Sequence, residues 1–215
     1  MYKKKPFFIV FEGVEGCGKS YQSKKLRKNL KNIGINSVLT REPGGTRSAE
    51  SIRTLILKDY FNKGKEEKFD KYTDTLLYLA ARNEHIINKI KPALKKKKVV
   101  ICDRFIDSTF AYQVYGKKVN KSFIDFIHRF ILQGIKPNII FILKVSSKTS
   151  KLRLKKRKTK NRYDNFSQSF YTKAQKSFLK IAKNKKNYFV LDSSSNNNDL
   201  EKKIFNIVCQ KLKIK

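Results

Sequence analysis

The segment GVEGCGKS, Gly13–Ser20, decides the fold of this chain. Its spacing, G-x-x-x-x-G-K-[ST], is that of a loop whose backbone amides surround phosphate groups. The apolar run Phe7–Phe11 precedes it, and Lys19–Ile33, with apolar residues at helical spacing, follows it. A strand that leads through such a loop into a helix N-terminus is the setting in which these loops bind phosphate. The sequence therefore predicts a site for a phosphorylated ligand.

Strands and helices are predicted to alternate along the rest of the chain. Apolar runs typical of buried parallel strands occupy residues 36–40, 99–102, 138–145 and 188–191. Helical patterns occupy residues 48–58, 73–94 with a kink at Pro92, 105–115, 121–133, 147–183 around a basic break near 158–163, and 199–213. This alternation predicts an α/β fold: a five-stranded parallel sheet with helices on both faces, in one domain over residues 1–215.

Length and cysteine content are those of an ordinary intracellular α/β domain. A chain of 215 residues can bury a large core without disulfides or metals. Its three cysteines, Cys17, Cys102 and Cys209, show no C-x-x-C spacing, which argues against a disulfide framework and a zinc site. No apolar run approaches the roughly 18 residues that span a bilayer. The basic start runs directly into the first strand and lacks a cleavage site, so we expect a cytoplasmic protein with no membrane partner.

The net charge of +34 has two interpretations. A strongly basic chain can bind nucleic acid, and the clusters 95–98 and 155–158 could form patches for it. However, 41 of the 51 basic residues are lysines, as a lysine-rich solvated surface would give. We favour the solvated interpretation and expect no specific nucleic acid partner.

The residues after the predicted third strand argue against a hydrolase. In motor ATPases this strand ends in Asp-Glu, and the Glu activates water, whereas here Arg104 follows Asp103. The N-K-x-D tetrad that reads guanine is also missing from the sequence. Arginine, in a chain where lysine predominates, suits positions that need a planar fork for phosphate. Seven arginines lie near strand ends, turns or the basic break and together suggest a site for several phosphates: Arg41, Arg53, Arg82, Arg104, Arg153, Arg157 and Arg162.

Five motifs in a fixed order resemble the thymidylate kinase family, which phosphorylates dTMP. They are GVEGCGKS (13–20), TREPGGT (40–46), LLYLAAR (76–82), DRFIDSTFAYQ (103–113) and the R-x-x-x-R…NRYD run (153–164). The resemblance covers residues 7–164, and the remaining strand and helix match the family's ending. It implies the P-loop kinase fold, ATP and dTMP as substrates, Mg²⁺ as cofactor, and a homodimer.

The resemblance assigns the donor site to the phosphate loop. ATP would be bound by Gly13, Val14, Glu15, Gly16, Cys17, Gly18, Lys19 and Ser20. Lys19 would reach the β- and γ-phosphates, and Ser20 together with Asp103 would hold Mg²⁺. Members with glycine at position 16 supply catalytic arginines from a mobile lid, here about 150–165, so Arg153, Arg157 and Arg162 become catalytic candidates beside Lys19 and Arg104. Asn161 stands where the family's lid has an acid, which leaves an orienting salt bridge there open.

The resemblance also assigns the acceptor site. Glu15 would receive the 3′-hydroxyl of dTMP, Arg104 and Arg53 its phosphate, and Tyr112 would crowd the 2′ position. Tyr78, where the family commonly has Phe, would stack on thymine, and Arg82, one helical turn away, would bind its edge. The remaining candidates are Glu42, Pro43 in a cis peptide, Ser108 and Thr109.

The implied chemistry is phosphoryl transfer by positioning and charge neutralisation. The acceptor phosphate is largely dianionic at neutral pH, so no general base is needed. No strong general-base candidate appears, since His85 and His128 lie in helical patterns away from the motifs. Two alternatives stay open: another nucleoside monophosphate or deoxynucleoside kinase, and a nucleic-acid-binding P-loop ATPase.

Overall fold

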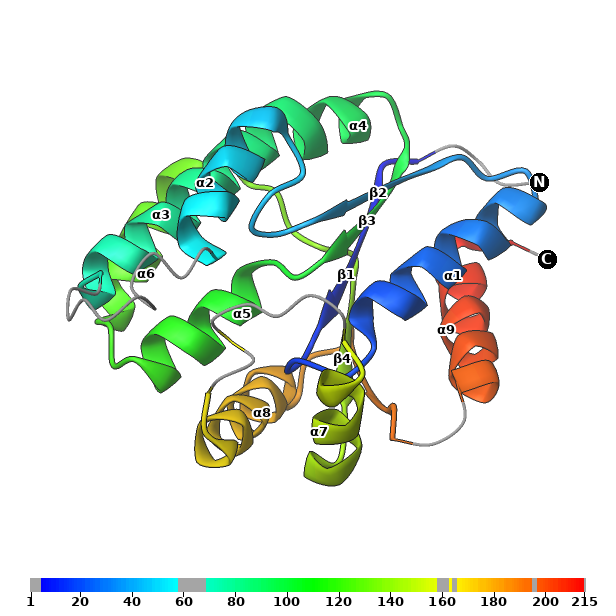
Figure 1. The fold of residues 1–215 in the computed structure, drawn as a ribbon. Coiled ribbons are helices and arrows are strands. Elements are labelled where there is room, and N and C mark those ends of the chain that lie inside the picture. The colour runs from blue at the N-terminus through cyan, green and yellow to red at the C-terminus, as the bar shows by residue number, and fades with distance from the viewer. Residues whose placement is uncertain (1–4, 58–68, 158–162, 164–165, 195–196, 215) are drawn as a thin grey trace.

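The computed structural model describes residues 5–57, 69–157, 163, 166–194 and 197–214. Five strands form one parallel sheet in the order β2-β3-β1-β4-β5 (Figure 1). Their bounds are β1 Phe7–Glu12, β2 Ser37–Arg41, β3 Val99–Asp103, β4 Ile139–Lys144 and β5 Tyr188–Asp192. The α/β fold predicted from the sequence is confirmed.

The central strands are buried on both faces, which explains why they read as continuous apolar runs. Every residue of β1 after Phe7 is buried, and so are the first four residues of β3. Phe11 pairs in register with Asp103, so the carboxyl ends of β1 and β3 lie side by side. The loops that follow these two strands, which carry two of the five motifs, are therefore neighbours in space.

Helices cover both faces of the sheet, as Figure 1 shows. Helices α1 and α9 pack together on one face, while α5 and α8 lie on the other. Helices α2, α3 and α6 form a further layer in which α3 contacts both of its neighbours. The bounds are α1 Lys19–Asn32, α2 Arg47–Leu57, α3 Lys71–His85, α4 Lys91–Lys95, α5 Ile106–Thr109, α6 Lys121–Ile131, α7 Ser147–Lys155, α8 Gln168–Ala182 and α9 Asn197–Leu212.

The helix predicted over residues 73–94 is interrupted one turn before its proline. A π-helical turn, η1 (Ile86–Ile90), joins α3 to α4, and the N–H of Lys91 donates to the carbonyl of Ile86, five residues back. Pro92 lacks an N–H, and its ring would clash with the carbonyl four residues earlier, so a wider turn just before it relieves the conflict. A second π-helical segment, η2 (Phe110–Gly116), continues α5 and completes the helix predicted over residues 105–115.

None of the helices in the described part of the chain is both long and apolar enough to cross a bilayer. The predicted loop over residues 59–71 falls almost wholly outside the described residues, as do the centre of the basic break and Arg162 within it.

Candidate active site

Two glycines of the phosphate loop are required by the tight packing around it. Gly13 has φ of +137°, and a Cβ there would lie 2.6 Å from the carbonyl oxygen of Leu143. Gly16 has φ of +72°, and a Cβ there would lie 2.8 Å from the carbonyl oxygen of Ser150. Only glycine adopts such backbone conformations without a steric cost. The loop is thus pressed between β4 and α7 at the carboxyl edge of the sheet.

Lys19 lies across the inside of this loop. Its ammonium group donates to the carbonyl oxygens of Gly13, at 3.0 Å, and Val14, at 2.8 Å. It also lies 3.5 Å from the Sγ atom of Cys17, which is fully buried beneath the loop. The single positive charge of this side chain is therefore held against the backbone of the loop, whose amides bind phosphate oxygens in loops of this kind.

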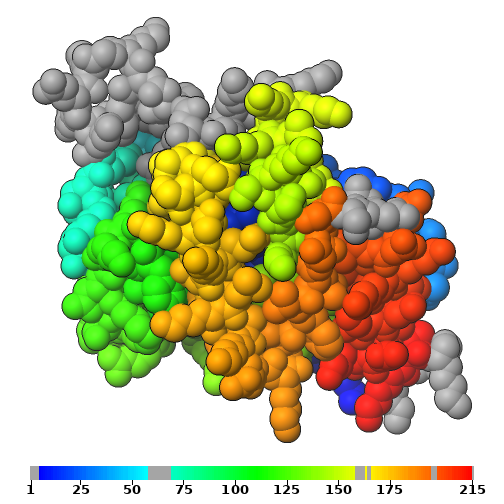
Figure 2. All heavy atoms as spheres, turned by 90° about the horizontal axis from the view of Figure 1, so that it is seen from below, coloured from blue at the N-terminus to red at the C-terminus, as the bar shows by residue number. Residues whose placement is uncertain are grey.

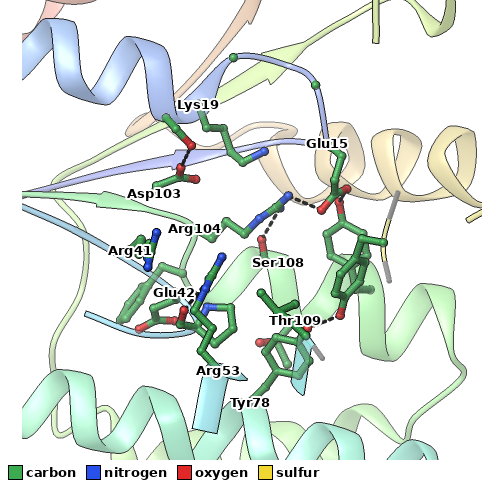
Figure 3. A pocket seen from close by; sticks show the side chains of 18 of the residues that line it. Glu15, Lys19, Arg41, Glu42, Arg53, Tyr78, Asp103, Arg104, Ser108 and Thr109 are labelled. Carbon is green, nitrogen blue, oxygen red and sulfur yellow. Dashed lines mark hydrogen bonds and ion pairs between the residues drawn. The ribbon is translucent and has the colours of Figure 1, made fainter. Parts of the chain in front are cut away.

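Ser20 and Asp103 come together although 83 residues separate them. The hydroxyl of Ser20 donates to the Oδ2 atom of Asp103, because β1 and β3 are adjacent and α1 starts directly behind the loop (Figure 3). A hydroxyl and a carboxylate oxygen are ligands that Mg²⁺ prefers, and Mg²⁺ in nucleotide sites takes only one or two protein ligands beside phosphates and water. The two residues predicted to hold Mg²⁺ fit that ion.

Arg104 is the centre of a polar cluster beside the loop. Its guanidinium group donates to Glu15 at 2.6 Å, to the Gly13 carbonyl at 2.9 Å and to the Ser108 hydroxyl at 3.1 Å (Figure 3). Tyr112 donates to the other oxygen of Glu15 at 2.6 Å. Nearby carboxylates, Glu15 first, outweigh the effect of burial and hold the pKa of Arg104 well above its ordinary value. The cluster thus presents a permanent cation beside the phosphate loop.

Glu12, which was not predicted from the sequence as a site residue, is hydrogen-bonded to Ser108 of this cluster. It is fully buried and accepts hydrogen bonds from the backbone N–H groups of Phe105, at 2.8 Å, and Ser108, at 3.2 Å. The Ser108 hydroxyl donates to its other oxygen at 2.6 Å. Burial, followed by the neighbouring carboxylate of Asp107, raises the pKa of Glu12 to about 8. The signal in the sequence that could have identified Glu12 is an acidic residue at the end of an apolar strand.

Arg82 is buried and points into the same region from α3. Its Nε donates to Glu42 at 2.7 Å, and its terminal nitrogens donate to Thr109 at 2.7 Å and to the carbonyl of Phe105 at 2.9 Å. His128 of α6 lies 2.9 Å from one of these nitrogens. The guanidinium group is therefore clamped by segments from three parts of the chain.

The prediction that both histidines lie away from the motifs is wrong. His128 contacts Arg82, and His85 lies 3.0 Å from Glu42 and 2.6 Å from the hydroxyl of Thr40. Burial alone would raise the pKa of Glu42, but Arg82 and His85 outweigh it and lower that pKa. Sequence reasoning missed these contacts because α3 and α6 bring the histidines to residues that lie more than 40 positions away.

The turn after β2 is organised by another residue that was missed, Glu50. The Glu42–Pro43 peptide is cis, as predicted, and the carbonyl of Pro43 accepts a hydrogen bond from Arg53 at 2.6 Å. Glu50 accepts two hydrogen bonds from Arg41, at 3.2 and 2.9 Å, and one from the N–H of Gly45, at 2.9 Å. Arg41 and Arg53 both line the cavity, and Arg41 is also joined to α2 through Glu50.

Aromatic rings form one wall of the site. The hydroxyl of Tyr78 is hydrogen-bonded to that of Tyr163, and the ring of Tyr112 meets Tyr163 edge-on at 5.6 Å between centroids. The conformation of Tyr78 is therefore tied to a residue of the basic segment predicted to form the lid.

Most of the groups described above line one cavity of about 530 Å³. Figure 2 shows atoms of the N-terminal segment at the bottom of a hollow between α7 and the start of α8. Most of the predicted site residues line this cavity: Glu15, Gly16, Gly18, Lys19, Ser20, Glu42, Pro43, Arg53, Tyr78, Arg82, Asp103, Arg104, Ser108, Thr109, Tyr112, Arg153 and Arg157. Gly13, Val14 and Cys17 do not line it, although Lys19 contacts all three.

A family model, curated relatives and a solved structure all relate this chain to the same family. The family described as Thymidylate kinase matches residues 11–204. A curated thymidylate kinase from a Wolbachia strain of Culex pipiens is 42% identical over 96% of this chain and 97% of its own. One from Sulfurihydrogenibium is 38% identical over 86% of this chain and 87% of its own. The crystal structure of thymidylate kinase from Ehrlichia chaffeensis superposes with a TM-score of 0.75, at 34% identity, covering 95% of this chain and 99% of that one.

The chain belongs to the thymidylate kinase family. Membership confirms the resemblance read from the five motifs, and the P-loop kinase fold with it.

In this member of the thymidylate kinase family, the three predicted lid arginines differ in what the structure shows of their contacts. Arg153 of α7 donates to the carbonyl oxygens of Gly16, at 3.2 Å, and Ser193, at 2.8 Å. Arg157 lines the cavity, and Arg162 lies outside the described residues. Arg153 therefore holds α7 against the phosphate loop, a contact that the sequence did not predict.

Proposed function

We propose that this chain transfers the γ-phosphoryl group of ATP to dTMP, giving ADP and dTDP. The observation that carries the proposal is that one cavity joins a phosphate loop, with Lys19, to the Arg104–Glu15–Tyr112 cluster and to Arg82. A donor and an acceptor can therefore meet in one site. Family membership supports the same reaction.

The phosphate loop is the proposed donor site. Backbone N–H groups of Gly13–Gly18 and the start of α1 would bind the ATP phosphates, and Lys19 would exchange its carbonyl partners for the β- and γ-oxygens. Ser20 and Asp103 would hold Mg²⁺ through their hydrogen-bonded oxygens. Bound there, Mg²⁺ would neutralise charge on the phosphates and orient them.

The Arg104 cluster is the proposed acceptor site. Arg104 and Arg53 would bind the dTMP phosphate, and Glu15 has lone pairs left to accept the 3′-hydroxyl, since a carboxylate offers about four acceptor sites. Tyr112, held by Glu15, would fill the space beside C2′. Tyr78 would stack on thymine, while Arg82 and Thr109 would bind its edge. Glu42, Pro43 and Ser108 would act through these residues, since each is hydrogen-bonded to one of the arginines.

Catalysis would come from alignment and charge neutralisation. The acceptor is already dianionic near neutral pH, so it can attack without a general base. Lys19 and Arg104 would flank the transferring group, and the lid arginines Arg153, Arg157 and Arg162 would add positive charge as residues 150–165 close over the site. Two of the three, Arg153 and Arg157, line the cavity.

A panel of acceptors tests the proposal. ADP formation from ATP and Mg²⁺ would be measured with dTMP, dUMP, dCMP, dGMP, AMP or single-stranded DNA added separately. We expect strong stimulation by dTMP. Preference for another nucleotide or a deoxynucleoside would identify a different small-molecule kinase, and stimulation by DNA would identify the ATPase alternative.

We also propose a cytoplasmic homodimer built on residues 1–215 as one domain. Large apolar side chains are exposed along α3, η1 and α6: Leu76 at 46%, Ile87 at 37%, Phe126 at 50% and Phe130 at 64%. Because α3 packs against α6, these residues belong to one layer of the molecule. An apolar surface of this kind on a lysine-rich protein suits a self-complementary contact between two copies.

A further inference from the structure

The guanidinium group of Arg82 makes four hydrogen bonds inside the protein. Glu42, Thr109 and the carbonyl of Phe105 accept three of them, and His128 is the fourth partner, 2.9 Å away. Arginine has five N–H donors in a rigid plane. Four contacts leave one N–H for a ligand, and they also fix the direction in which it points.

His128 must be neutral and must accept at Nε2. Arginine only donates, so the Nε2 atom opposite it carries a lone pair, and the ring proton resides on Nδ1. Burial, followed by the charge of Arg82, lowers the pKa of His128 to about 3. The ring is thus an acceptor at every pH at which the protein would work.

The two hydrogens of one Arg82 nitrogen, Nη1, have different partners. One is taken by Thr109, which α5 carries, and the other by His128, which α6 carries. Without an acceptor on α6, that buried hydrogen would be left unpaired or the guanidinium plane would turn to find another partner. Either change would move the remaining N–H of Arg82, a residue that lines the cavity.

We propose that His128 is a positioning residue for recognition of the base: it orients Arg82 so that its remaining N–H meets an acceptor on the thymine edge. This inference rests on the proposed function. It adds a determinant of specificity that does not touch the substrate and lies on α6, outside the five sequence motifs. Helix α6 also carries Phe126 and Phe130, so the helix that reaches the base-recognition arginine also presents the exposed apolar surface.

The experiment compares two replacements of His128. In His128→Gln, the side-chain oxygen can take the place of Nε2 as acceptor, whereas His128→Leu has similar bulk and no acceptor. The quantity measured is the ratio of kcat/KM for dTMP to that for dCMP, whose amino group offers a donor where thymine offers an acceptor. We expect this ratio to fall at least about 10-fold in the Leu variant, as loss of one hydrogen bond to a charged group implies, and to recover most of the way in the Gln variant.

A packing control separates orientation from stability. Ile124→Ala removes a fully buried apolar side chain from the same helix, one that offers Arg82 no hydrogen-bond acceptor. It should lower the melting temperature and leave the dTMP to dCMP ratio unchanged. The KM for ATP should be unchanged in the Leu and Gln variants, since neither touches the phosphate loop.

The inference is overturned if the wild-type chain phosphorylates dTMP and the Leu variant keeps the wild-type ratio, or if Ile124→Ala lowers the ratio equally. Should the Leu variant fail to fold, ¹⁵N NMR of His128 in the wild-type protein decides instead. A neutral ring protonated at Nδ1 at pH 7 supports the inference, and a protonated Nε2 contradicts it. Failure of the wild type to use dTMP would instead refute the proposed function.

Discussion

At the scale of single residues, the site depends on cations held in place by buried acceptors. Arg104 is held by Glu15, Gly13 and Ser108, and Arg82 by Glu42, Thr109, Phe105 and His128. A preorganised cation costs no reorganisation at the moment of reaction, which is why such groups can contribute strongly to phosphoryl transfer. Substitution of a residue proposed to face the phosphate of dTMP should therefore lower kcat. Substitution of a residue proposed to face the base should raise the KM for dTMP.

Arg104→Ala should lower kcat with dTMP by about 10²- to 10³-fold, because it removes a charge beside the proposed position of the transferring group. Arg104→Lys should recover only part of the rate, since a lysine cannot bridge Glu15, Gly13 and Ser108 at once. Steady-state kinetics and circular dichroism check this. Near-normal turnover of a folded Ala variant would remove Arg104 from the site.

Tyr78→Ala should raise the KM for dTMP about 10-fold or more and leave the KM for ATP nearly unchanged, because stacking on a base contributes about 1–3 kcal/mol. Tyr78→Phe is the matched control: it keeps the ring and removes the hydrogen bond to Tyr163. Equal effects of the Ala variant on both KM values would contradict the stacking assignment.

Glu12 should make stability fall as pH rises. Its pKa is about 8 in the folded protein against an ordinary value of 4.5, so the folded state binds more protons between these values, and unfolding becomes easier as pH increases through that window. Glu12→Gln cannot titrate, so it should gain stability relative to wild type from pH 5 to pH 8. Urea unfolding at several pH values measures the difference, and parallel curves for the two proteins would show that Glu12 does not titrate in this range.

At the scale of elements, α7 is joined to the phosphate loop. The Ser150 hydroxyl donates to the carbonyl of Glu15 at 2.8 Å, and Arg153 donates to the carbonyl of Gly16 at 3.2 Å. Since α7 leads into the basic segment, the loop proposed to bind the donor and the segment proposed to close over it share one supporting helix. Gly16, which the sequence analysis associated with lid arginines, also allows this close contact.

Gly16→Ala should weaken ATP binding, because its Cβ would lie 2.8 Å from the backbone oxygen of Ser150 in a conformation that alanine rarely adopts. The KM for ATP should rise several-fold, with a smaller change for dTMP. Gly34→Ala is the control for the loss of a glycine with positive φ, since nothing lies within 4 Å of the added Cβ. Wild-type kinetics in Gly16→Ala would mean that α7 can withdraw from the loop without consequence.

At the scale of the whole molecule, the feature that bears on association is the exposed apolar surface on α3, η1 and α6. Phe126 and Phe130 contact each other at 5.1 Å between ring centroids, and Arg129 lies over Phe126. Burying such rings between two copies would remove apolar area from water at about 25 cal/mol per Å². The repulsion expected from a charge of +34 makes a specific contact of this kind necessary for association.

Phe130→Glu should convert a dimer into a monomer, because it places a charge where an apolar side chain is 64% exposed. Sedimentation velocity measures the change, and Val190→Glu, at an exposed apolar side chain of β5, is the control. A wild-type protein that sediments as a monomer, or a Phe130→Glu variant that remains dimeric, would contradict the proposed interface.

Sequence by itself determined the phosphate loop, the alternation of strands and helices, and the family, because these depend on neighbouring residues. A glycine with positive φ, an apolar run or a motif involves only a few consecutive residues, so it can be recognised in the sequence. For this reason the strands and most helices agree with the prediction within a few residues. The cis peptide at Pro43 was predicted from the family resemblance, and the structure has it.

Only the tertiary structure decided which side chains support the site. Glu12 meets Ser108 and His128 meets Arg82 across separations of 96 and 46 residues, and no local pattern encodes such contacts. In the sequence, nothing distinguishes an acid at a strand end or a histidine in an amphipathic helix from an ordinary core residue. Its role becomes visible only when packing brings its partner within hydrogen-bond distance. The physical reason is that backbone conformation depends on local sterics, whereas hydrogen bonds between distant elements depend on how whole helices and strands pack.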